Sequence, residues 1–349
     1  MMTIEQVKQA LKGYRGRNIK IMEVCGTHTA AIIKSGIRDH LSDRIRLVSG
    51  PGCPVCVTSP SYMDAACEAA HKPGHVLATF GDMMKVPGFK SNIYETRASG
   101  GRIEMVYSPL TILEKAERNP DTVYVMAAVG FETTAPVYAV LLEEAIRQGI
   151  RNIRLLTAIK TIIPAMESIL KSEDIDGFIC PGHVSAVIGS TAYRPLSEKY
   201  GKPMVVTGFD GNSILVSLFE IMRQVNEGKG EVRNLYAGVV AEEGNKKALE
   251  LIDKYFEPGD AVWRGIGEIK GSGLRLRPEY RAYRYDYDDS PAEETKLTAG
   301  CRCADVIRGR INPDSCPLFG KACTPVKPQG ACMVSMEGAC GIWYAQTNQ

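Results

Sequence analysis

The chain has 349 residues, of which 44% are hydrophobic and 23% charged, and its formal net charge is +2. These values are typical of a soluble globular protein with two or three domains and a core large enough to fold without disulfides. A charge so close to zero gives no indication of nucleic acid or an anionic membrane surface as a partner. The most apolar stretch, residues 122–146, is interrupted by charged residues and a proline, so we expect no membrane span.

The eleven cysteines need an explanation other than disulfides. The N-terminus lacks the apolar core of a signal peptide, which favours a cytoplasmic location, where disulfides rarely persist. Metal binding or redox chemistry is then the better interpretation. Six of the cysteines lie between Cys301 and Cys340, and the other five are Cys25, Cys53, Cys56, Cys67 and Cys180.

In chain order, the first predicted element is a short amphipathic helix that ends near Gly13. From residue 19 to about residue 240, short β-rich runs then alternate with helical stretches. The expected strands span residues 19–24, 44–48, 75–80, 102–107, 122–129, 153–158, 177–179 and 203–207, and the expected helices include residues 60–70, 135–148, 163–171 and 213–225. Most of these strands are almost continuously apolar, as expected for strands that are buried on both faces of a parallel sheet.

This alternation predicts an α/β fold with two Rossmann-like parallel-sheet domains, residues 1–120 and residues 121–240. The pattern changes in residues 241–349. Glycines between residues 265 and 273 indicate a loop-rich stretch, and the polar residues 281–295 indicate a linker. The cysteine-rich tail that follows is predicted to form a small third domain.

Unusual polar segments directly follow six of the predicted strands. They are CGTHT at 25–29, GPGCPVC at 50–56, GDMM at 81–84, GFETT at 130–134, PGHVS at 181–185 and GFDG at 208–211. In open α/β sheets, functional loops gather outside the carboxyl ends of the strands. The six segments are therefore predicted to converge on one crevice or on the cleft between two domains.

Cys25 is predicted to lie at a strand end, just before a glycine and the start of a helix. Backbone N–H groups and the helix dipole favour a thiolate at such a position. His28, three residues later, could donate or accept a proton there. The alternative is a buried structural cysteine beside a capping threonine.

Cys53 and Cys56 form a Cys-x-x-Cys unit, whose thiols can close a disulfide, share a metal or act as a redox dithiol. A zinc site would need two further ligands at a matching spacing. Cys25, His28 and Cys67 fit no familiar zinc pattern. We therefore favour a redox dithiol over a zinc site and over a purely structural pair.

Glu132, His183 and Asp210 are candidate acid–base groups or supporting groups for a site at the strand ends. Each has a simpler alternative as a helix cap or as a hydrogen-bonding partner within a loop. Cys67 falls inside a predicted helix and is expected to be a core residue. The role of Cys180, beside His183, stays open.

The tail contains Cys301, Cys303, Cys316, Cys323, Cys332 and Cys340. A [4Fe–4S] cluster takes four cysteine thiolates, which leaves two thiols for a dithiol or disulfide pair. Glycines and prolines near these cysteines suit a chain that wraps around a cluster. A zinc site is the alternative, although the tail has no pair of close Cys-x2–4-Cys knuckles.

Taken together, these motifs resemble those of the hydrogenase maturation protein HypD family over essentially the whole chain. The matching segments are CGTHT at 25–29, GPGCPVC at 50–56, GDMMKVPG at 81–88, GFETT at 130–134, PGHVS at 181–185, CPLFGKACTP at 316–325 and ACMVSMEGAC at 331–340. Several of them are long and unusual, which argues against a chance match. No motif cysteine departs from the family pattern.

The resemblance implies two Rossmann-like domains plus a small [4Fe–4S] domain, in a scaffold on which the Fe(CN)2CO group of [NiFe]-hydrogenases is assembled. It implies a complex with a HypC-type small chaperone, whose N-terminal cysteine would share the iron. A HypE-type protein would deliver cyanide, and the loaded group would pass to the hydrogenase large-subunit precursor. Of the residues, Cys25 would be the iron-binding thiolate, with Cys53 and Cys56 as a nearby dithiol.

The tail also resembles that of ferredoxin:thioredoxin reductase. This likeness implies that the cluster ligands are Cys301, Cys316, Cys323 and Cys340, and that Cys303 pairs with Cys332. We hypothesise that electrons pass from the cluster through Cys303 and Cys332 to the Cys53–Cys56 pair. On this reading His28, Glu132 and His183 tune the site or move protons.

Two other classes of protein compete with this interpretation. A stand-alone iron–sulfur oxidoreductase would turn over a small molecule without a partner. A zinc-stabilised binding module would be colourless and would hold zinc in the tail. Neither class explains the cysteine loops at the strand ends together with the six-cysteine tail.

Overall fold

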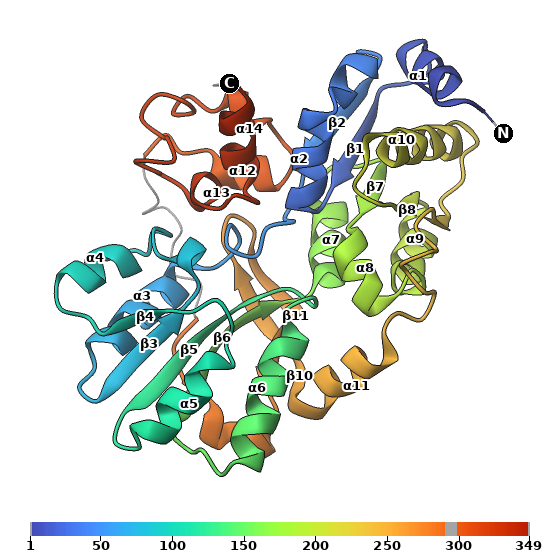
Figure 1. Ribbon diagram of the computed structural model, residues 1–349. Coiled ribbons are helices and arrows are strands. Elements are labelled where there is room, and N and C mark those ends of the chain that lie inside the picture. Colours follow the sequence, from blue (N-terminus) through green and yellow to red (C-terminus); the bar gives the residue numbers. More distant parts are fainter. Residues whose placement is uncertain (1, 290–298, 348–349) are drawn as a thin grey trace.

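The computed structural model describes residues 2–289 and 299–347, and it contains two sheets with flanking helices and a separate cysteine-rich tail (Figure 1). Sheet A has five parallel strands in the order β2-β1-β7-β8-β9. Sheet B has six strands in the order β10-β11-β6-β5-β3-β4; its β6, β5, β3 and β4 are parallel, and β11 is antiparallel to both β6 and β10. The predicted α/β class with two mainly parallel sheets is confirmed.

The strands are β1 (Ile19–Glu23), β2 (Ile45–Ser49), β3 (His75–Thr79), β4 (Ile103–Met105), β5 (Val123–Gly130), β6 (Ile153–Lys160), β7 (Gly177–Cys180), β8 (Met204–Val206), β9 (Val232–Asn234), β10 (Phe256–Trp263) and β11 (Gly267–Leu276). The helices are α1 (Ile4–Lys12), α2 (Gly26–Lys34), α3 (Pro60–His71), α4 (Ile93–Ala98), α5 (Thr111–Arg118), α6 (Ala135–Arg147), α7 (Ile162–Ser172), α8 (Gly182–Ile188), α9 (Arg194–Tyr200), α10 (Gly211–Asn226), α11 (Lys246–Tyr255), α12 (Cys303–Ile307), α13 (Ala331–Val334) and α14 (Ala339–Thr347). Every strand and helix predicted above is present, with ends that differ by a few residues.

The two sheets do not follow the boundary expected near residue 120. Strands β1 and β2 from the first predicted domain join β7, β8 and β9 from the second in sheet A. Strands β3 and β4 likewise join β5 and β6 in sheet B. The chain thus leaves sheet A after β2, builds most of sheet B, and returns to pair β7 with β1. Local hydrophobic patterning cannot reveal this, because it identifies strands without naming their partners.

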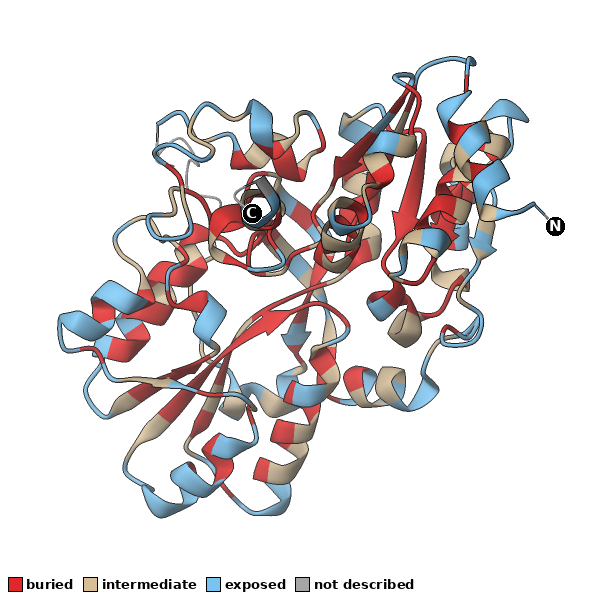
Figure 2. Ribbon diagram, turned by 45° about the horizontal axis from the view of Figure 1, so that its top comes forward, coloured by how far each residue is buried: buried red, intermediate tan, exposed pale blue. Residues whose placement is uncertain are grey.

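The central strands of each sheet are buried (Figure 2). On one side of sheet A the apolar core includes Ile21, Ile179 and Val205. A larger core includes Val48 of sheet A, Leu156 of sheet B and Cys332 of the tail. This shared core joins both sheets to the tail at the carboxyl ends of the sheet A strands.

The glycine-containing stretch after residue 255 is a β-hairpin, so the prediction of a loop there is wrong. Strands β10 and β11 pair along most of their length, with an irregularity between Gly259 and Ala261. The turn between them uses Gly265 and Gly267 at φ of +78° and +102°, which favour glycine. Glycine lowers β propensity within a strand, which is why this hairpin escaped detection.

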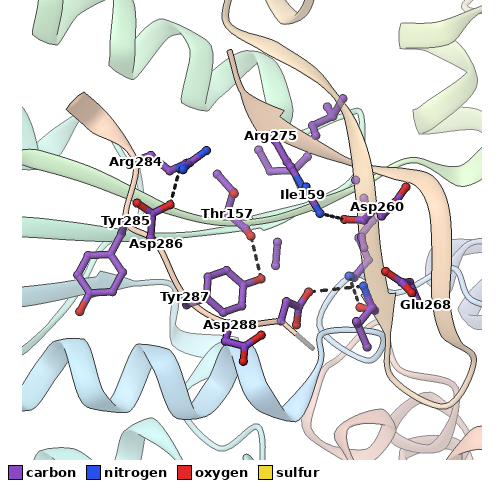
Figure 3. Close-up of a pocket in the computed structure, with 17 residues that line it drawn as sticks. Thr157, Ile159, Asp260, Glu268, Arg275, Arg284, Tyr285, Asp286, Tyr287 and Asp288 are labelled. Carbon is purple, nitrogen blue, oxygen red and sulfur yellow. Dashed lines mark hydrogen bonds and ion pairs between the residues drawn. The ribbon is translucent and has the colours of Figure 1, made fainter. Parts of the chain in front are cut away.

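The first part of the predicted linker is attached to sheet B (Figure 3). The backbone N–H of Tyr285 donates to the carbonyl of Leu155 at 2.9 Å, and the Tyr287 hydroxyl donates to the carbonyl of Thr157 at 3.2 Å. This segment walls a cavity of about 510 Å³ that no cysteine lines. Residues 290–295 of the linker lie outside the described residues.

The cysteine-rich tail, residues 299–347, packs on sheet A beside the first helix after β1 (Figure 1). Helix α14 contacts α2, and the guanidinium of Arg38 lies 4.7 Å above the ring of Trp343. In the described part of the chain, none of the helices combines the length and the apolar character that a membrane span requires.

Candidate functional site

Cys25 lies between the end of β1 and the first turn of α2, and it is 8% exposed. Burial has the largest effect on its thiol and raises its pKa to about 11. The nearby backbone N–H groups of His28 and Thr27 lower the pKa, although Cys25 makes no side-chain capping hydrogen bond to α2. The expectation that the helix start favours a thiolate is therefore wrong for the protein alone, because burial outweighs the helix N–H groups.

Glu23, the last residue of β1, is a buried carboxylate that sequence reasoning overlooked. Its Oε2 accepts a hydrogen bond from the backbone N–H of Cys25 at 3.0 Å, and its Oε1 accepts one from the Thr29 hydroxyl at 2.5 Å. The Ser49 side chain bonds it as well. Burial raises the pKa of Glu23, and these hydrogen bonds oppose the rise. The signal was an acidic residue between the apolar Met22 and Val24, just before the CGTHT segment.

His28 and His183 flank the ring of Phe209. The centroid distances to Phe209 are 4.6 Å for His28 and 4.2 Å for His183. His28 Nε2 lies 3.0 Å from the carbonyl of Gly208, so this nitrogen carries the proton and Nδ1 is an acceptor. Burial lowers the pKa of His28 to about 4, which keeps the ring neutral near pH 7. The CGTHT, PGHVS and GFDG segments therefore meet, as predicted.

Three glycines allow the cysteine loops to approach one another closely. A Cβ on Gly52 would overlap the backbone at Cys25, and a Cβ on Gly26 would overlap the carbonyl of Glu337. A Cβ on Gly338 would lie 3.0 Å from the sulfur of Cys56. The tail segment at Glu337 and Gly338 therefore runs in direct contact with the start of α2 and with the GPGCPVC segment.

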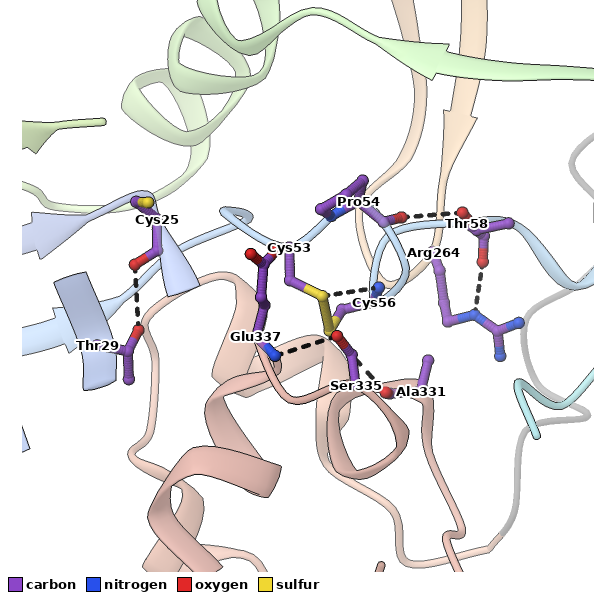
Figure 4. The surroundings of a disulfide bond; sticks show 10 residues. All are labelled: Cys25, Thr29, Cys53, Pro54, Cys56, Thr58, Arg264, Ala331, Ser335 and Glu337. Carbon is purple, nitrogen blue, oxygen red and sulfur yellow. Dashed lines mark hydrogen bonds between the residues drawn. A yellow bond between two sulfur atoms is a disulfide. The ribbon is translucent and has the colours of Figure 1, made fainter. Parts of the chain in front are cut away.

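Cys53 and Cys56 form a disulfide, as the redox-pair interpretation allows (Figure 4). Both are buried, and the sulfur of Cys56 lies 3.9 Å from the carbonyl of Ala331 in the tail. A small cavity is lined by this disulfide together with Cys332 and Glu337. One tail cysteine therefore faces the same small space as the disulfide.

All six tail cysteines line a second small cavity. Its other walls are Leu318, Phe319, Gly330 and Met333, so apart from the thiols its lining is apolar. No three His, Cys, Asp or Glu side chains of the described residues are arranged to hold a single ion. A [4Fe–4S] cluster is bound differently, because its thiolates attach to separate iron atoms around a volume. The six sulfurs around one apolar cavity fit such a group better than they fit zinc.

The tail thiols also hydrogen-bond to one another in a row. Cys303 bonds Cys301 on one side and Cys332 on the other, and Cys332 also bonds Cys340. The hydrogen bonds from its two neighbours lower the pKa of Cys303. Cys303 and Cys332 are thus adjacent free thiols, and Cys332 lines both this cavity and the one at the disulfide.

Glu132 follows β5 in sheet B and is 5% exposed. Its Oε1 accepts a hydrogen bond from the backbone N–H of Ile162 at 2.8 Å, so it caps α7 rather than the helix that follows it in sequence. Its Oε2 is buried and has no hydrogen-bonding partner among the described residues. Burial raises the pKa of Glu132 to about 7. Such a group can exchange a proton near neutral pH.

The structure gives the remaining predicted residues simpler roles, as a helix cap or as buried residues of a helix or strand. Asp210 caps α10, since its carboxylate accepts from the backbone N–H and the hydroxyl of Ser213. Cys67 is buried in α3, beside the side chain of Thr96. Cys180 is fully buried in β7, and burial raises its pKa. The assignment of catalytic or ligand roles to the predicted site residues stays a prediction.

The family model described as "HypD: Hydrogenase formation hypA family" matches residues 2–347. The chain belongs to the HypD family. Among curated relatives, it is 41% identical over 346 residues to "Hydrogenase maturation factor HypD" of Azotobacter vinelandii, covering 95% of this chain and 90% of the relative. It is 38% identical over 337 residues to the protein of that name in Escherichia coli K12, with coverage of 95% and 90%. It is 41% identical over 328 residues to "Putative hydrogenase expression/formation protein MJ0993" of Methanocaldococcus jannaschii, with coverage of 93% and 91%.

Membership in the HypD family confirms the resemblance drawn from the motifs, and the structure adds residues that motif reading left out. Glu23 fixes the backbone of Cys25, and Glu337 brings a tail carboxylate to the same place. Burial raises the pKa of Glu337, and the nearby Asp82 carboxylate adds to the rise. The GDMM segment of sheet B therefore also faces this region. Glu337 lies within the ACMVSMEGAC segment at 331–340, but it was not among the predicted site residues.

Proposed function

We propose that this HypD-family protein is a hydrogenase maturation factor that binds iron at Cys25 and supports assembly of its Fe(CN)2CO group. One observation carries the proposal. The Cys25 segment, the Cys53–Cys56 disulfide and the six-cysteine tail meet at the carboxyl ends of the sheet A strands. A metal-binding thiol, a redox pair and a candidate cluster site are thereby combined within one small region.

Cys25 is the thiol best suited to iron that carries cyanide and carbon monoxide. Soft thiolates bind such iron well. Burial keeps Cys25 protonated in the protein alone, so iron binding releases the thiol proton, and the dipole of α2 then favours the thiolate at the start of that helix. His28, neutral and fixed to Gly208, supports the helix start without adding charge.

One protein thiolate does not complete the coordination of such iron, so a partner must supply more ligands. We infer that a HypC-type small chaperone contributes a second thiolate at this place. A HypE-type protein would deliver the cyanide, and the hydrogenase large-subunit precursor would receive the finished group. The names of the curated relatives, which are hydrogenase maturation or formation factors, support this assignment.

The tail cavity suits a [4Fe–4S] cluster, for which we assign Cys301, Cys316, Cys323 and Cys340 as ligands. Such a cluster supplies single electrons when bound. Cys303 and Cys332 then remain as a dithiol pair, in agreement with the hydrogen bond between them. Cys332 is the member of this pair that also lines the cavity at the Cys53–Cys56 disulfide.

The two pairs can exchange oxidation state without another reactant. The pKa of Cys332 is raised by its cysteine neighbours and by burial, so it must first lose its proton. Its thiolate then attacks the sulfur of Cys56, a mixed disulfide forms, and Cys53 leaves as a thiolate. The Cys303 thiolate then attacks Cys332, which closes the Cys303–Cys332 disulfide and releases Cys56. Two electrons move to the Cys53–Cys56 pair, and the two protons lost by one dithiol are taken up by the other.

Infrared spectroscopy of the protein purified anaerobically with its small chaperone tests the iron assignment. We expect sharp CN and CO stretching bands that are lost in Cys25→Ala and kept in Cys67→Ala, a matched buried cysteine in α3. Bands that survive Cys25→Ala would move the iron to another ligand. Absence of bands from the wild-type complex, with its cluster intact, would instead favour a stand-alone iron–sulfur oxidoreductase.

The thiol exchange has its own test. In Cys303→Ala, mass spectrometry after thiol trapping should find the Cys53–Cys56 pair oxidised under conditions that reduce it in the wild type. Maturation activity should fall in parallel. Normal reduction of that pair together with full activity in Cys303→Ala would rule out this route.

A further inference from the structure

We propose that Glu23 is the positioning residue of Cys25, because its buried carboxylate ties the Cys25 segment to helix α2 and to the GPGCPVC segment and so fixes where the Cys25 sulfur stands. The proposal rests on the proposed function for the role of that sulfur as the iron ligand. The hydrogen bonding itself is independent of the iron.

Three donors from three elements meet at the Glu23 carboxylate. The backbone N–H of Cys25 belongs to the turn after β1, and the Thr29 hydroxyl belongs to α2. The third is Ser49, the last residue of β2, whose next neighbour is Gly50 at the start of the GPGCPVC segment. One side chain therefore holds together the two segments that carry Cys25 and the Cys53–Cys56 disulfide.

A buried carboxylate at this position needs a reason, since burying a charge carries a desolvation cost that an apolar side chain of the same size avoids. Glu23 is 2% exposed, and Ile21 and Met22 beside it are fully buried and apolar. What an apolar residue cannot do is accept a hydrogen bond from the Cys25 backbone. We infer that the carboxylate is kept because it defines a single arrangement of this turn.

That arrangement determines what the Cys25 sulfur contacts. Cys25 is extended, with φ −154° and ψ 123°, which places it just outside the first turn of α2. Gly52 packs directly on its backbone. Without an acceptor at Glu23, the Cys25 N–H would be buried and unpaired, and the turn would be expected to rearrange.

Glu23 is also connected to the tail through a cation. The guanidinium of Arg38 acts electrostatically on Glu23 and donates to the carbonyl of Leu47 at 3.0 Å. The same guanidinium lies over Trp343 of α14. A change at Glu23 should therefore be felt at the contact between α2 and the tail as well as at Cys25.

Two substitutions of Glu23 distinguish the effect of its hydrogen bonds from the effect of its side-chain volume. Glu23→Gln keeps an acceptor oxygen for the Cys25 N–H, and the hydroxyls of Thr29 and Ser49 can rotate to accept from its amide. Glu23→Met fills a similar volume but accepts no such hydrogen bond. The readout is the rate at which iodoacetamide alkylates Cys25 in the full chain, followed by peptide mass spectrometry.

We expect Glu23→Met to raise that rate by about 10-fold or more, the factor that corresponds to loss of a hydrogen bond to a charged group. Glu23→Gln should stay within about 3-fold of wild type because it keeps the acceptor. An unchanged rate in a folded Glu23→Met protein would overturn the proposal. If that variant does not fold, Thr29→Val combined with Ser49→Ala replaces it, and an unchanged rate there would equally overturn the proposal.

Asp176→Leu is the matched control. Asp176 is likewise a buried carboxylate that accepts a backbone N–H of β1, from Lys20 at 2.8 Å, but at the opposite end of the strand. Its loss should lower the melting temperature and leave the alkylation rate of Cys25 unchanged. A general loosening of sheet A would raise the rate in both variants and would contradict a positioning role.

Infrared spectra of the chaperone complex then distinguish this proposal from the proposed function. Bands that are present in wild type and Glu23→Gln but shifted or lost in Glu23→Met support both the positioning role of Glu23 and the iron role of Cys25. Bands identical in all three, with equal alkylation rates, overturn positioning alone. A faster alkylation rate in Glu23→Met, with no bands in any sample, upholds positioning and counts against the iron role of Cys25.

Discussion

The thiol carried by sheet A and the thiols of the tail are held in opposite ways. Cys25 stands at the start of α2, where Glu23 accepts a hydrogen bond from its backbone N–H. The six tail cysteines line one cavity whose other walls are apolar. The first arrangement is built by the fold, whereas the second consists of thiols around a space.

These two arrangements lead to different expectations of how far each site needs a bound metal group in order to stay ordered. Strands and a helix hold the Cys25 site, so on the proposed function it can exist before iron arrives and after iron leaves. On the proposed function, the six tail thiols, which stand on short helices and loops, would gain much of their order from the cluster. We therefore expect loss of the cluster to disturb the tail far more than loss of iron disturbs Cys25.

The largest effect should come from removing a cluster ligand. Cys340→Ser should lower iron from about four atoms per chain to below about one after reconstitution, because a cluster needs its four thiolates. Iron analysis and the visible absorbance spectrum measure this, together with protease cleavage of residues 299–347. Cys67→Ser, outside the tail, is the control. Full iron and a protease-resistant tail in Cys340→Ser would contradict the contrast between the two sites.

The stability of the two-sheet part of the molecule, in contrast, should depend on pH through Glu132, which follows β5 in sheet B. Its pKa in the fold is about 7 against 4.5 ordinarily, so the folded state binds the proton more tightly than the unfolded state does. Stability from this group is full below pH 4.5 and falls as pH rises to 7, by about 3 kcal/mol in total. Urea unfolding from pH 5 to pH 8 should show a smaller loss of stability in Glu132→Gln. Parallel pH profiles for the two proteins would show that burial does not control this carboxyl.

A smaller effect is expected where the two regions meet. In Gly26→Ala the new Cβ overlaps the tail carbonyl of Glu337, and we expect a loss of about 1–3 kcal/mol of stability as the tail shifts. Gly238→Ala is the matched control, because no atom lies within 4 Å of its added Cβ. Urea unfolding measures both. Equal stabilities would mean that the tail can move away from α2 at no cost.

The smallest effect should come from Asp210, which lies in a predicted site loop but acts as a helix cap. Asp210→Ala should cost about 1 kcal/mol of stability through loss of the cap on α10. Asn245→Ala, at the cap of α11, should cost a similar amount. The infrared bands of the complex should be unchanged in both variants. Lost bands in Asp210→Ala alone would return this residue to the site.

Much of the site could be predicted from sequence because its chemistry is concentrated in short segments at strand ends. Cys25, Cys53 and Cys56 each follow an apolar strand, and parallel strands bring such segments to one edge. Buried strands also produce long apolar runs, which is why the strand positions from β1 to β8 were predicted within a few residues.

Only the tertiary structure decided how these elements are combined. The pairing of β1 with β7, the β10–β11 hairpin and the contact of Gly338 with Cys56 join residues far apart in the chain. It also decided the protonation of Cys25, because local sequence shows a helix start that favours a thiolate while burial by distant segments favours the thiol. Local patterns fix which residues form a strand or a turn. Pairing, burial and charge depend on which distant residues arrive beside them.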